Sequence, residues 1–405
     1  MPIVVQKYGG SSVADVEKIG KVADRVAATK AAGKDVVVVV SAMGDTTDDL
    51  LALARKVTTN PARRELDMLL SAGERISMTL LSMALNERGV PALSFTGSQS
   101  GIVTNDAHTN ARIVEVRPFR VQDELARGKV VIVAGYQGVS YKKEVTTLGR
   151  GGSDTTAVAL AAALDAEACE IYSDVDGVYT ADPRVVPDAR RLAELSYEEM
   201  QELAEAGARV LNAQAVEFAK ERGIAIYARA AGAGPGETVV RKLPPRAPGR
   251  VVGVTSETGL VLVTAQGPSA LRALVEVLHD HGAAGKEILL RPGDGTSLAS
   301  VLLSLENLHD FALLKLALQA RPGDGVRVRE GLGAVSAIGA GINASLGNLH
   351  RALLAVEELG APVLGASTSS FRITLLMGTD AVPDAVRRLH RRLVTEAEEA
   401  RSPAE

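Results

Sequence analysis

Five consecutive valines at positions 36–40 limit the fold of this chain more than any other feature. A strand with no polar residue over that length is typical of a parallel sheet, whose central strands are buried on both faces. Mainly apolar segments also lie at 2–6, 129–134 and 167–173, and helical patterns separate them. The alternation continues to about residue 240 and predicts an α/β fold, with an open, mainly parallel sheet and helices on both faces.

The proline-rich, basic stretch RKLPPRAPGR at 241–250 is the expected linker. Beyond it the pattern becomes β-α-β-β-α-β, which occurs roughly twice and is typical of ferredoxin-like modules. We expect residues 250–266, at the start of the first module, to form two strands around a turn. The sequence therefore predicts three domains, at 1–243, 250–325 and 326–396.

Charge and composition disfavour several classes of partner. The 405 residues carry a formal net charge of -4, with no basic run, no tryptophan and 3% aromatic residues, which argues against nucleic-acid binding. No apolar run reaches membrane-spanning length, and the first residues lack the pattern of a signal peptide. The single cysteine, Cys169, cannot form an internal disulfide. We expect a cytoplasmic protein with no membrane or nucleic-acid partner.

Four polar loops follow expected strands, at 7–12, 41–48, 147–154 and 173–184. Ligands of open α/β sheets bind beyond the carboxyl ends of the strands, so we expect all four loops at that edge. In KYGGSS, at 7–12, two glycines would let backbone N–H groups approach an anion, and Lys7 would add a positive charge. A tight strand-to-helix turn with a solvated lysine explains the same residues equally well.

The second loop and the helix after it allow two interpretations each. Ser41 and Thr47 could contact a ligand, while Asp45, Thr46 or Thr47 could each cap the helix that follows. Glu74 lies in an otherwise apolar helix. A charge in such a place more often marks an exposed face or a buried ion pair than a ligand contact.

The third loop opens the stretch TTLGRGGSDTTAVALAAAL at 146–164. We expect Ser153 or Asp154 to cap a helix at 155–164, whose first N–H groups would form an anion site. Arg150 could grip a carboxylate in bidentate fashion and Asp154 could hold an ammonium group, which together fit a free α-amino acid. The alternative is one ordinary cap and an internal Arg–Asp pair.

The fourth loop, in YSDVDGVYTADPR at 172–184, lacks the later ligands of a calcium-binding loop. A turn that presents Tyr179 and Arg184 to a nucleotide fits better. A plain loop with turn-forming Asp and Gly residues is the alternative.

Five ordered blocks resemble the aspartate kinases, which have the amino-acid kinase fold. They are KYGGSS, VVVSAMGDTTD, SAGERIS, TTLGRGGSDTTAVALAAAL and EIYSDVDGVYTADPR, and the match runs from residue 3 to about 210. The modules after residue 250 resemble the tandem ACT repeats that end chains of this family. The resemblance implies ATP-dependent phosphorylation of the L-aspartate β-carboxylate to 4-phospho-L-aspartate, the first step of lysine, threonine and methionine biosynthesis.

The resemblance also implies roles for individual residues. Lys7 and Asp154 match the catalytic pair, and Asp154 would hold the substrate ammonium group and orient Lys7. The positions that match substrate contacts are Ser41, Thr47, Glu74 and Arg150. The positions that match ATP contacts are Lys7, Gly9, Gly10, Ser11, Ser173, Asp174, Tyr179, Arg184 and Arg209. ATP and Mg²⁺ are the implied cofactors, and no side chain is assigned as a metal ligand.

The chain departs from the family pattern at several points. Asn212-Ala213-Gln214 and the segment 227–237 differ near the nucleotide side, which puts ATP affinity in doubt. In the modules, Lys286 stands near an acidic position of the usual inhibitor segment, and Ser370 replaces a usual Glu. We therefore expect feedback inhibition by lysine or threonine to be weak, absent or redirected to another amino-acid effector.

Two alternatives to an aspartate kinase stay open at this point. One is a kinase for another acidic amino acid or an aspartate analogue in specialised metabolism, and the other is a non-catalytic ACT-type regulatory protein. Since ACT modules pair subunits in this family, we expect a homo-oligomer, a dimer through these modules.

Overall fold

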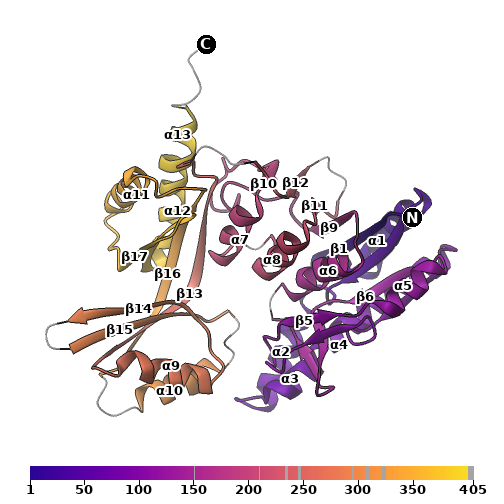
Figure 1. Ribbon diagram of the computed structural model, residues 1–405, viewed down its shortest axis with the longest axis horizontal. Helices are drawn as coiled ribbons and strands as arrows, with labels where there is room; N and C mark the ends of the chain where they lie inside the picture. The colour runs from indigo at the N-terminus through magenta and orange to yellow at the C-terminus, as the bar shows by residue number, and fades with distance from the viewer. Residues whose placement is uncertain are drawn as a thin grey trace. The chain divides into compact units, whose positions relative to one another are not determined.

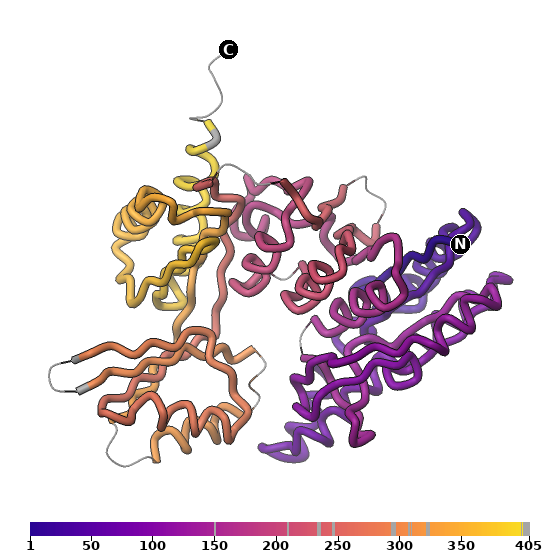
Figure 2. The backbone as a smooth tube through the Cα atoms, in the orientation of Figure 1, coloured from indigo at the N-terminus to yellow at the C-terminus, as the bar shows by residue number. Residues whose placement is uncertain are grey.

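The computed structural model describes residues 1–149, 151–208, 210–232, 236–244, 248–293, 296–306, 308, 310–320 and 325–399 (Figures 1 and 2). The chain forms two compact units. The first consists of Met1–Tyr179, Arg190–Glu205 and Arg209–Pro245, and the second of Thr180–Ala189, Ala206–Ala208 and Arg246–Glu405. In the part of the chain that the structure describes, no helix is long and apolar enough to cross a membrane.

An eight-stranded sheet forms the centre of the first unit, in the order β10-β12-β11-β9-β1-β2-β6-β3. All neighbouring strands run parallel except β11 and β12, which confirms the mainly parallel sheet. The strands are β1 (Ile3–Tyr8), β2 (Asp35–Val40), β3 (Ala92–Phe95), β6 (Val130–Ala134), β9 (Ala168–Ser173), β10 (Glu194–Leu195), β11 (Ile226–Ala230) and β12 (Glu237–Val240).

The valine run forms β2, and all six residues of this strand are buried. Val36, Val38 and Val40 belong to the core that α1 and α4 form on one face of the sheet. Val37 and Val39 point to the opposite face because side chains alternate along a strand. On that face α6 contacts β1, β2 and β9.

The helices of the first unit connect these strands and cover both faces of the sheet (Figure 1). They are the 3₁₀ turn η1 (Gly10–Val13), α1 (Val16–Ala31), α2 (Thr46–Val57), α3 (Arg63–Leu70), α4 (Ala72–Glu87), α5 (Phe119–Ala126), α6 (Gly152–Ala163), α7 (Tyr197–Glu205) and α8 (Ala213–Arg222).

A second, four-stranded sheet changes one prediction. It consists of β4 (Ile102–Thr104), β5 (Ile113–Val116), β7 (Gln137–Ser140) and β8 (Val145–Thr147), in the order β5-β4-β7-β8. The loop at 147–154 follows β8 of this small sheet, so the expectation that it follows a strand of the large sheet is wrong. The loop reaches the large sheet through α6, which packs on β1.

The second unit is built on one antiparallel sheet of six strands, in the order β14-β15-β13-β16-β18-β17. Its elements are β13 (Gly253–Gln266), α9 (Ala270–Asp280), β14 (Gly285–Gly293), β15 (Thr296–Ser304), α10 (Phe311–Gln319), β16 (Arg327–Ile338), α11 (Gly347–Glu357), β17 (Gly365–Thr368), β18 (Arg372–Gly378), η2 (Thr379–Ala381), α12 (Val382–His390), η3 (Arg391–Thr395) and α13 (Glu396–Glu399). The order β-α-β-β-α occurs twice, and the first strands of the two repeats, β13 and β16, pair with each other.

The turn expected within 250–266 does not form. β13 continues through this segment as one strand with register shifts between Thr258 and Leu260 and between Leu260 and Leu262. Gly259 has a φ of +71°, a conformation that glycine adopts without strain. The glycine therefore serves a bulge within a strand and not a hairpin.

Candidate functional site

A buried ion pair at the edge of the large sheet joins Lys7 and Asp154. Lys7 lies near the end of β1, and its Nζ is 2.6 Å from Asp154 Oδ1 in the first turn of α6. The two side chains are only 11% and 8% exposed. An ion pair this far from solvent is weakly screened, so it fixes the ammonium group in one place.

The glycine turn after β1 packs tightly on the loop after β2. A Cβ on Gly10 would lie 2.9 Å from both Ala42 O and Gly44 O, and the Gly44 N–H donates to Gly10 O at 3.0 Å. Gly9 has more room, since a Cβ there would be 3.6 Å from Lys7 Nζ. Ser11 is exposed. The turn therefore leaves the backbone beside Lys7 without any side chain that would exclude a phosphate.

Glu74 lies in the first turn of α4 and is 2% exposed, which rules out the exposed face as one of the interpretations left open. Its Oε1 accepts a hydrogen bond from the Ala42 N–H at 3.2 Å. Its Oε2 is buried and has no hydrogen-bond partner among the described residues. Burial raises the pKa of Glu74 to about 7. A carboxyl group in this condition would gain from a cationic ligand.

Ser41 and Thr47 lie on the same loop as Ala42. The Ser41 N–H donates to Tyr8 O at 3.1 Å, and Ser41 O accepts from Ser77 Oγ at 2.7 Å. Thr47 is half-buried in the first turn of α2. Asp45 occupies the cap position of α2 but makes no side-chain cap hydrogen bond.

The start of α6 differs from the prediction. The helix begins at Gly152, and its cap position is Gly151, whose φ of +71° suits glycine. Ser153 and Asp154 therefore lie inside the first turn, and neither caps the helix. Asp154 is free to pair with Lys7 because its carboxylate is not used as a cap.

The residues predicted to contact nucleotide belong to both units of the chain. Ser173 is the last residue of β9, which pairs with β1 through Tyr172 and Tyr8, and Asp174 follows it. Tyr179 donates to Asp176 Oδ1 at 2.7 Å. Arg184 belongs to the second unit, where its guanidinium pairs with Asp182 at 2.7 Å.

The structure thus gathers Lys7, Gly9, Gly10, Ser41, Glu74 and Asp154 around the ends of β1 and β2. Ser173, at the end of β9, and Asp174 after it come next in the sheet, because β9 pairs with β1. Arg150 and Arg209 lie outside the described residues.

Two contributors were missed or misjudged from the sequence. Ser77 supports the Ser41 backbone, and its place one helical turn after Glu74 was the available signal. Asn212 caps α8 by accepting from the Gln214 N–H at 2.9 Å, and its Oδ1 also accepts from Thr155 Oγ1 at 3.3 Å. An Asn before a helical pattern is an N-cap signal, so this departure from the family pattern has a structural explanation.

Comparison with known proteins gives the family. A model of the amino acid kinase family matches residues 2–228, more than half of the chain. Curated aspartokinases of Mycolicibacterium smegmatis and Corynebacterium glutamicum are 45% and 43% identical to it, each over 96% of both chains. The fold is similar to that of E. coli aspartokinase III in complex with aspartate and ADP, with a TM-score of 0.83, 25% identity and coverage of 96% of this chain and 99% of that one.

The same E. coli enzyme in complex with lysine and aspartate has a TM-score of 0.70 to this chain at 26% identity, covering 97% of this chain and 99% of that one. An open sheet with a glycine turn and a buried Lys–Asp pair at its edge is suited to binding a small anionic ligand, and the comparisons identify the class as a kinase of small molecules. The chain belongs to the amino acid kinase family, and within that family to the aspartokinases.

Proposed function

We propose that this enzyme transfers the γ-phosphoryl group of ATP to the side-chain carboxylate of L-aspartate, giving 4-phospho-L-aspartate and ADP. The observation that carries the proposal is the buried Lys7–Asp154 ion pair beside the Gly9–Gly10 turn, in a chain 45% identical to an aspartokinase. This is the reaction that opens lysine, threonine and methionine biosynthesis in the family. A kinase for another acidic amino acid, or a non-catalytic regulatory protein, fits the intact pair and the identity less well.

The chemistry needs positioning and charge neutralisation more than acid–base catalysis. The nucleophile is a carboxylate, which is already ionised at neutral pH, so no general base is required. The bond from its oxygen to the γ-phosphorus forms as the bond to the β–γ bridging oxygen breaks, and ADP takes the electron pair. Lys7, held by Asp154, would place a positive charge at the transferring group.

We propose that Mg²⁺ would enter the site bound to the phosphates of ATP. Among the described residues, no group of three or more His, Cys, Asp and Glu side chains could hold a metal ion. Mg²⁺ commonly keeps waters and binds through substrate phosphates with one or two carboxylates. The described residues therefore fit a Mg²⁺ ion that ATP brings with it. This ion would lower the repulsion between the two anionic reactants.

The two substrates would use different sides of the site. Arg150 would hold the α-carboxylate of aspartate, with Ser41, Thr47 and Glu74 on the same side. The buried Oε2 of Glu74 suits the substrate ammonium group, because Asp154 is already paired with Lys7. Gly9, Gly10, Ser11, Ser173, Asp174, Tyr179, Arg184 and Arg209 would serve ATP.

Regulation through the second unit is proposed to differ from that of the lysine-bound E. coli relative. Lys286 forms an ion pair with Glu257, so a cationic side chain occupies the region where the family pattern has an acidic one. At position 286 the acidic group that could hold the ammonium group of an amino-acid effector is therefore missing. We expect lysine and threonine to inhibit weakly or not at all, and a clear inhibition curve at millimolar concentration of either would contradict this.

We keep the domain boundaries 1–243, 250–325 and 326–396, a cytoplasmic location and a homodimer through the ACT modules as proposals. The edge strand β14 exposes Ile288, Leu289 and Leu290, and an apolar edge of this kind favours pairing with a second copy. Light scattering would test the dimer, and Leu290→Glu is expected to shift it toward monomer.

ADP release from the purified enzyme, measured with a panel of acidic amino acids, tests the function. We expect turnover with L-aspartate and far less with L-glutamate or D-aspartate. Lys7→Ala should lower kcat by about a hundredfold or more, by loss of charge stabilisation. Arg150→Ala should mainly raise the aspartate KM. Near-normal turnover by Lys7→Ala would refute the mechanism, and preference for another acceptor would favour the second kinase.

A further inference from the structure

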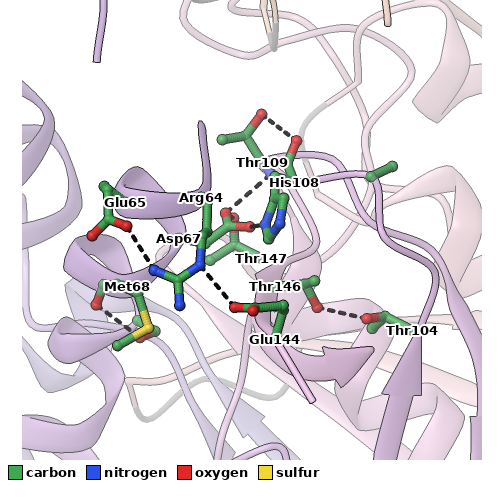
Figure 3. A network of polar contacts seen from close by, with 12 residues as sticks. Arg64, Glu65, Asp67, Met68, Thr104, His108, Thr109, Glu144, Thr146 and Thr147 are labelled. Atoms are coloured by element: carbon green, nitrogen blue, oxygen red, sulfur yellow. Dashed lines mark hydrogen bonds and ion pairs between the residues drawn. The ribbon is translucent and has the colours of Figure 1, made fainter. Parts of the chain in front are cut away.

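A buried carboxylate outside the residues named above lies at the centre of a polar network (Figure 3). Asp67, in α3, is 0% exposed. Its Oδ1 accepts from Thr147 Oγ1 at 2.5 Å and from the Thr109 N–H at 3.0 Å. Its Oδ2 is 2.6 Å from His108 Nδ1. Three segments, α3, the loop before β5 and the end of β8, therefore meet at one side chain.

The network costs free energy, because it buries a carboxylate and holds Thr109 in a rare backbone conformation. This cost argues against an incidental contact. Burial raises the pKa of Asp67, and the contacts from Thr147, His108 and Thr109 act in the opposite direction. Thr109 has a φ of +67°, a region that β-branched residues rarely adopt. That conformation lets one turn present both the His108 ring and the Thr109 N–H to the same carboxylate. An apolar residue at position 67 would avoid these costs.

The position of the network gives it a consequence for the site. Thr147 is the last residue of β8, three residues before Arg150 and seven before Asp154. The main chain of Thr147 is held as well, because its carbonyl accepts from the Ala111 N–H at 2.9 Å. The end of β8 is thus tied to the Asp67 network through both its side chain and its backbone.

The other side of the network leads to Glu74. Asp67 precedes Glu74 by seven residues, and α3 and α4 meet at Ser71. Gln137, which pairs with Thr147 across β7 and β8, donates from Nε2 to Ser71 O at 2.9 Å in a buried contact. The segment that carries Glu74 and the segment that leads to Arg150 are therefore joined around Asp67.

A direct chemical role for the Asp–His pair fits less well. In hydrolytic triads a hydroxyl contacts the histidine, whereas here the Thr147 hydroxyl donates to the aspartate. The proposed reaction also needs no base, since its nucleophile is a carboxylate. The network is suited to holding two segments at a fixed separation.

We propose that Asp67, oriented by His108, is a positioning residue of the aspartate site, which sets the separation between the segment carrying Glu74 and the end of β8 at Thr147. This inference rests on the proposed function. A misplacement of about 1 Å at a reacting site can lower the reaction rate by about two orders of magnitude. Because the two joined segments carry residues proposed to hold aspartate, the effect should fall on aspartate and not on ATP.

The test compares neighbouring threonines of β8. Thr146 is as buried as Thr147, but its hydroxyl pairs with Thr104 Oγ1 at 2.6 Å and does not contact Asp67. Thr147→Val and Thr146→Val each remove one buried hydroxyl from the same strand. Steady-state ADP release gives KM for both substrates and kcat for each variant. Thr147→Ser restores the donor, and Asp67→Asn and His108→Gln change the other partners.

We expect Thr147→Val, Asp67→Asn and His108→Gln to raise the aspartate KM at least tenfold, with the ATP KM within twofold of wild type. Thr147→Ser should recover most of the loss, and Thr146→Val should leave the aspartate KM near wild type. Equal aspartate KM values for Thr147→Val and Thr146→Val, or parallel changes in both substrates, would overturn the positioning role.

The wild-type enzyme in the same assay separates this inference from the proposed function. An active wild type with unaffected variants overturns only the role of Asp67. A wild type without aspartate-dependent ADP release overturns the proposed function, and the positioning role with it.

Discussion

The buried carboxyl group of Glu74 lowers the stability of the fold at neutral pH but is suited to binding the ammonium group of the substrate. Its pKa is about 7 because burial disfavours its charge, while the ordinary value for a glutamate is 4.5. The ionised form is the one that attracts an ammonium group. We expect the aspartate KM to fall roughly tenfold between pH 6 and pH 8 as Glu74 loses its proton. Glu74→Gln should raise the KM and flatten this pH dependence, and an unchanged slope in that variant would assign the titration to another group.

The raised pKa of Glu74 has the opposite effect on the stability of the protein: as pH rises, substrate binding improves but the folded state becomes less stable. A carboxyl whose pKa is raised on folding binds more protons in the folded state, so its contribution to stability declines as pH rises from about 4.5 to about 7. Glu74→Gln should therefore gain stability relative to wild type over this window, by up to about 3 kcal/mol at pH 7. Urea unfolding at pH 5 and pH 7.5 measures this, and equal gains at both values would contradict the buried, unpaired carboxyl.

At the scale of elements, the two adjacent glycines of the turn after β1 have different roles: Gly10 is needed for packing, and Gly9 lies beside the expected ATP site. A Cβ on Gly10 would press on two backbone oxygens at 2.9 Å, whereas one on Gly9 would meet its nearest atoms at 3.6 Å. We expect Gly10→Ala to lower the stability of the protein by about 1–3 kcal/mol through overpacking. Gly9→Ala should fold normally but raise the ATP KM, because its methyl group would lie beside Lys7. Thermal unfolding and ATP titration distinguish the two, and similar melting temperatures would refute the packing argument.

The residue at which α6 begins decides whether Asp154 caps the helix or pairs with Lys7. A helix that began at residue 155 would use Ser153 or Asp154 as a cap. Because Gly151 adopts a positive φ, the helix begins earlier, and the Asp154 carboxylate turns to Lys7 instead. The glycines around Arg150 are thus explained in part by the geometry of the helix start.

At the scale of the whole molecule, the segment Thr180–Ala189 belongs to the second unit although the chain reaches it from the first. Ala181 and Val186 are buried in the core that contains Val335, Ile373 and Leu389. The Val254 N–H donates to Thr180 O at 2.7 Å, and Thr180 Oγ1 lies 2.8 Å from His390 Nε2. The chain that continues from the expected nucleotide loop is therefore anchored in the C-terminal unit.

This anchoring predicts that the first unit will not behave as an independent kinase. A fragment ending at residue 245 would leave Ala181 and Val186 without their core, and we expect it to aggregate or to show a raised ATP KM. In the full chain, Val186→Ala should cost about 1–2 kcal/mol of stability by leaving a cavity. Wild-type melting temperature and ATP KM in the fragment would show that the segment does not need the C-terminal unit.

Some features could be read directly from the residues. The five valines predicted a doubly buried parallel strand, because a short run of β-branched apolar residues favours a strand covered on both faces, and β2 is that strand. The family blocks placed Lys7 and Asp154 in one site, and the two side chains are in contact. The proline-rich stretch at 241–250 predicted a linker between domains ending at 243 and beginning at 250, and these boundaries stay a prediction.

Other features depended on contacts between distant segments. Asp67 in RRELDMLL has the local appearance of a surface residue, and it is buried only because β8 and the loop at 105–111 fold onto α3. Gly259 has the local signature of a turn, and pairing on both sides keeps it within a strand. Local sequence by itself determined which strands are buried and which loops carry charge, since those depend on nearby residues. Only the tertiary structure decided which carboxylates are left unpaired, paired or held as anchors, because that depends on which distant donors each one meets.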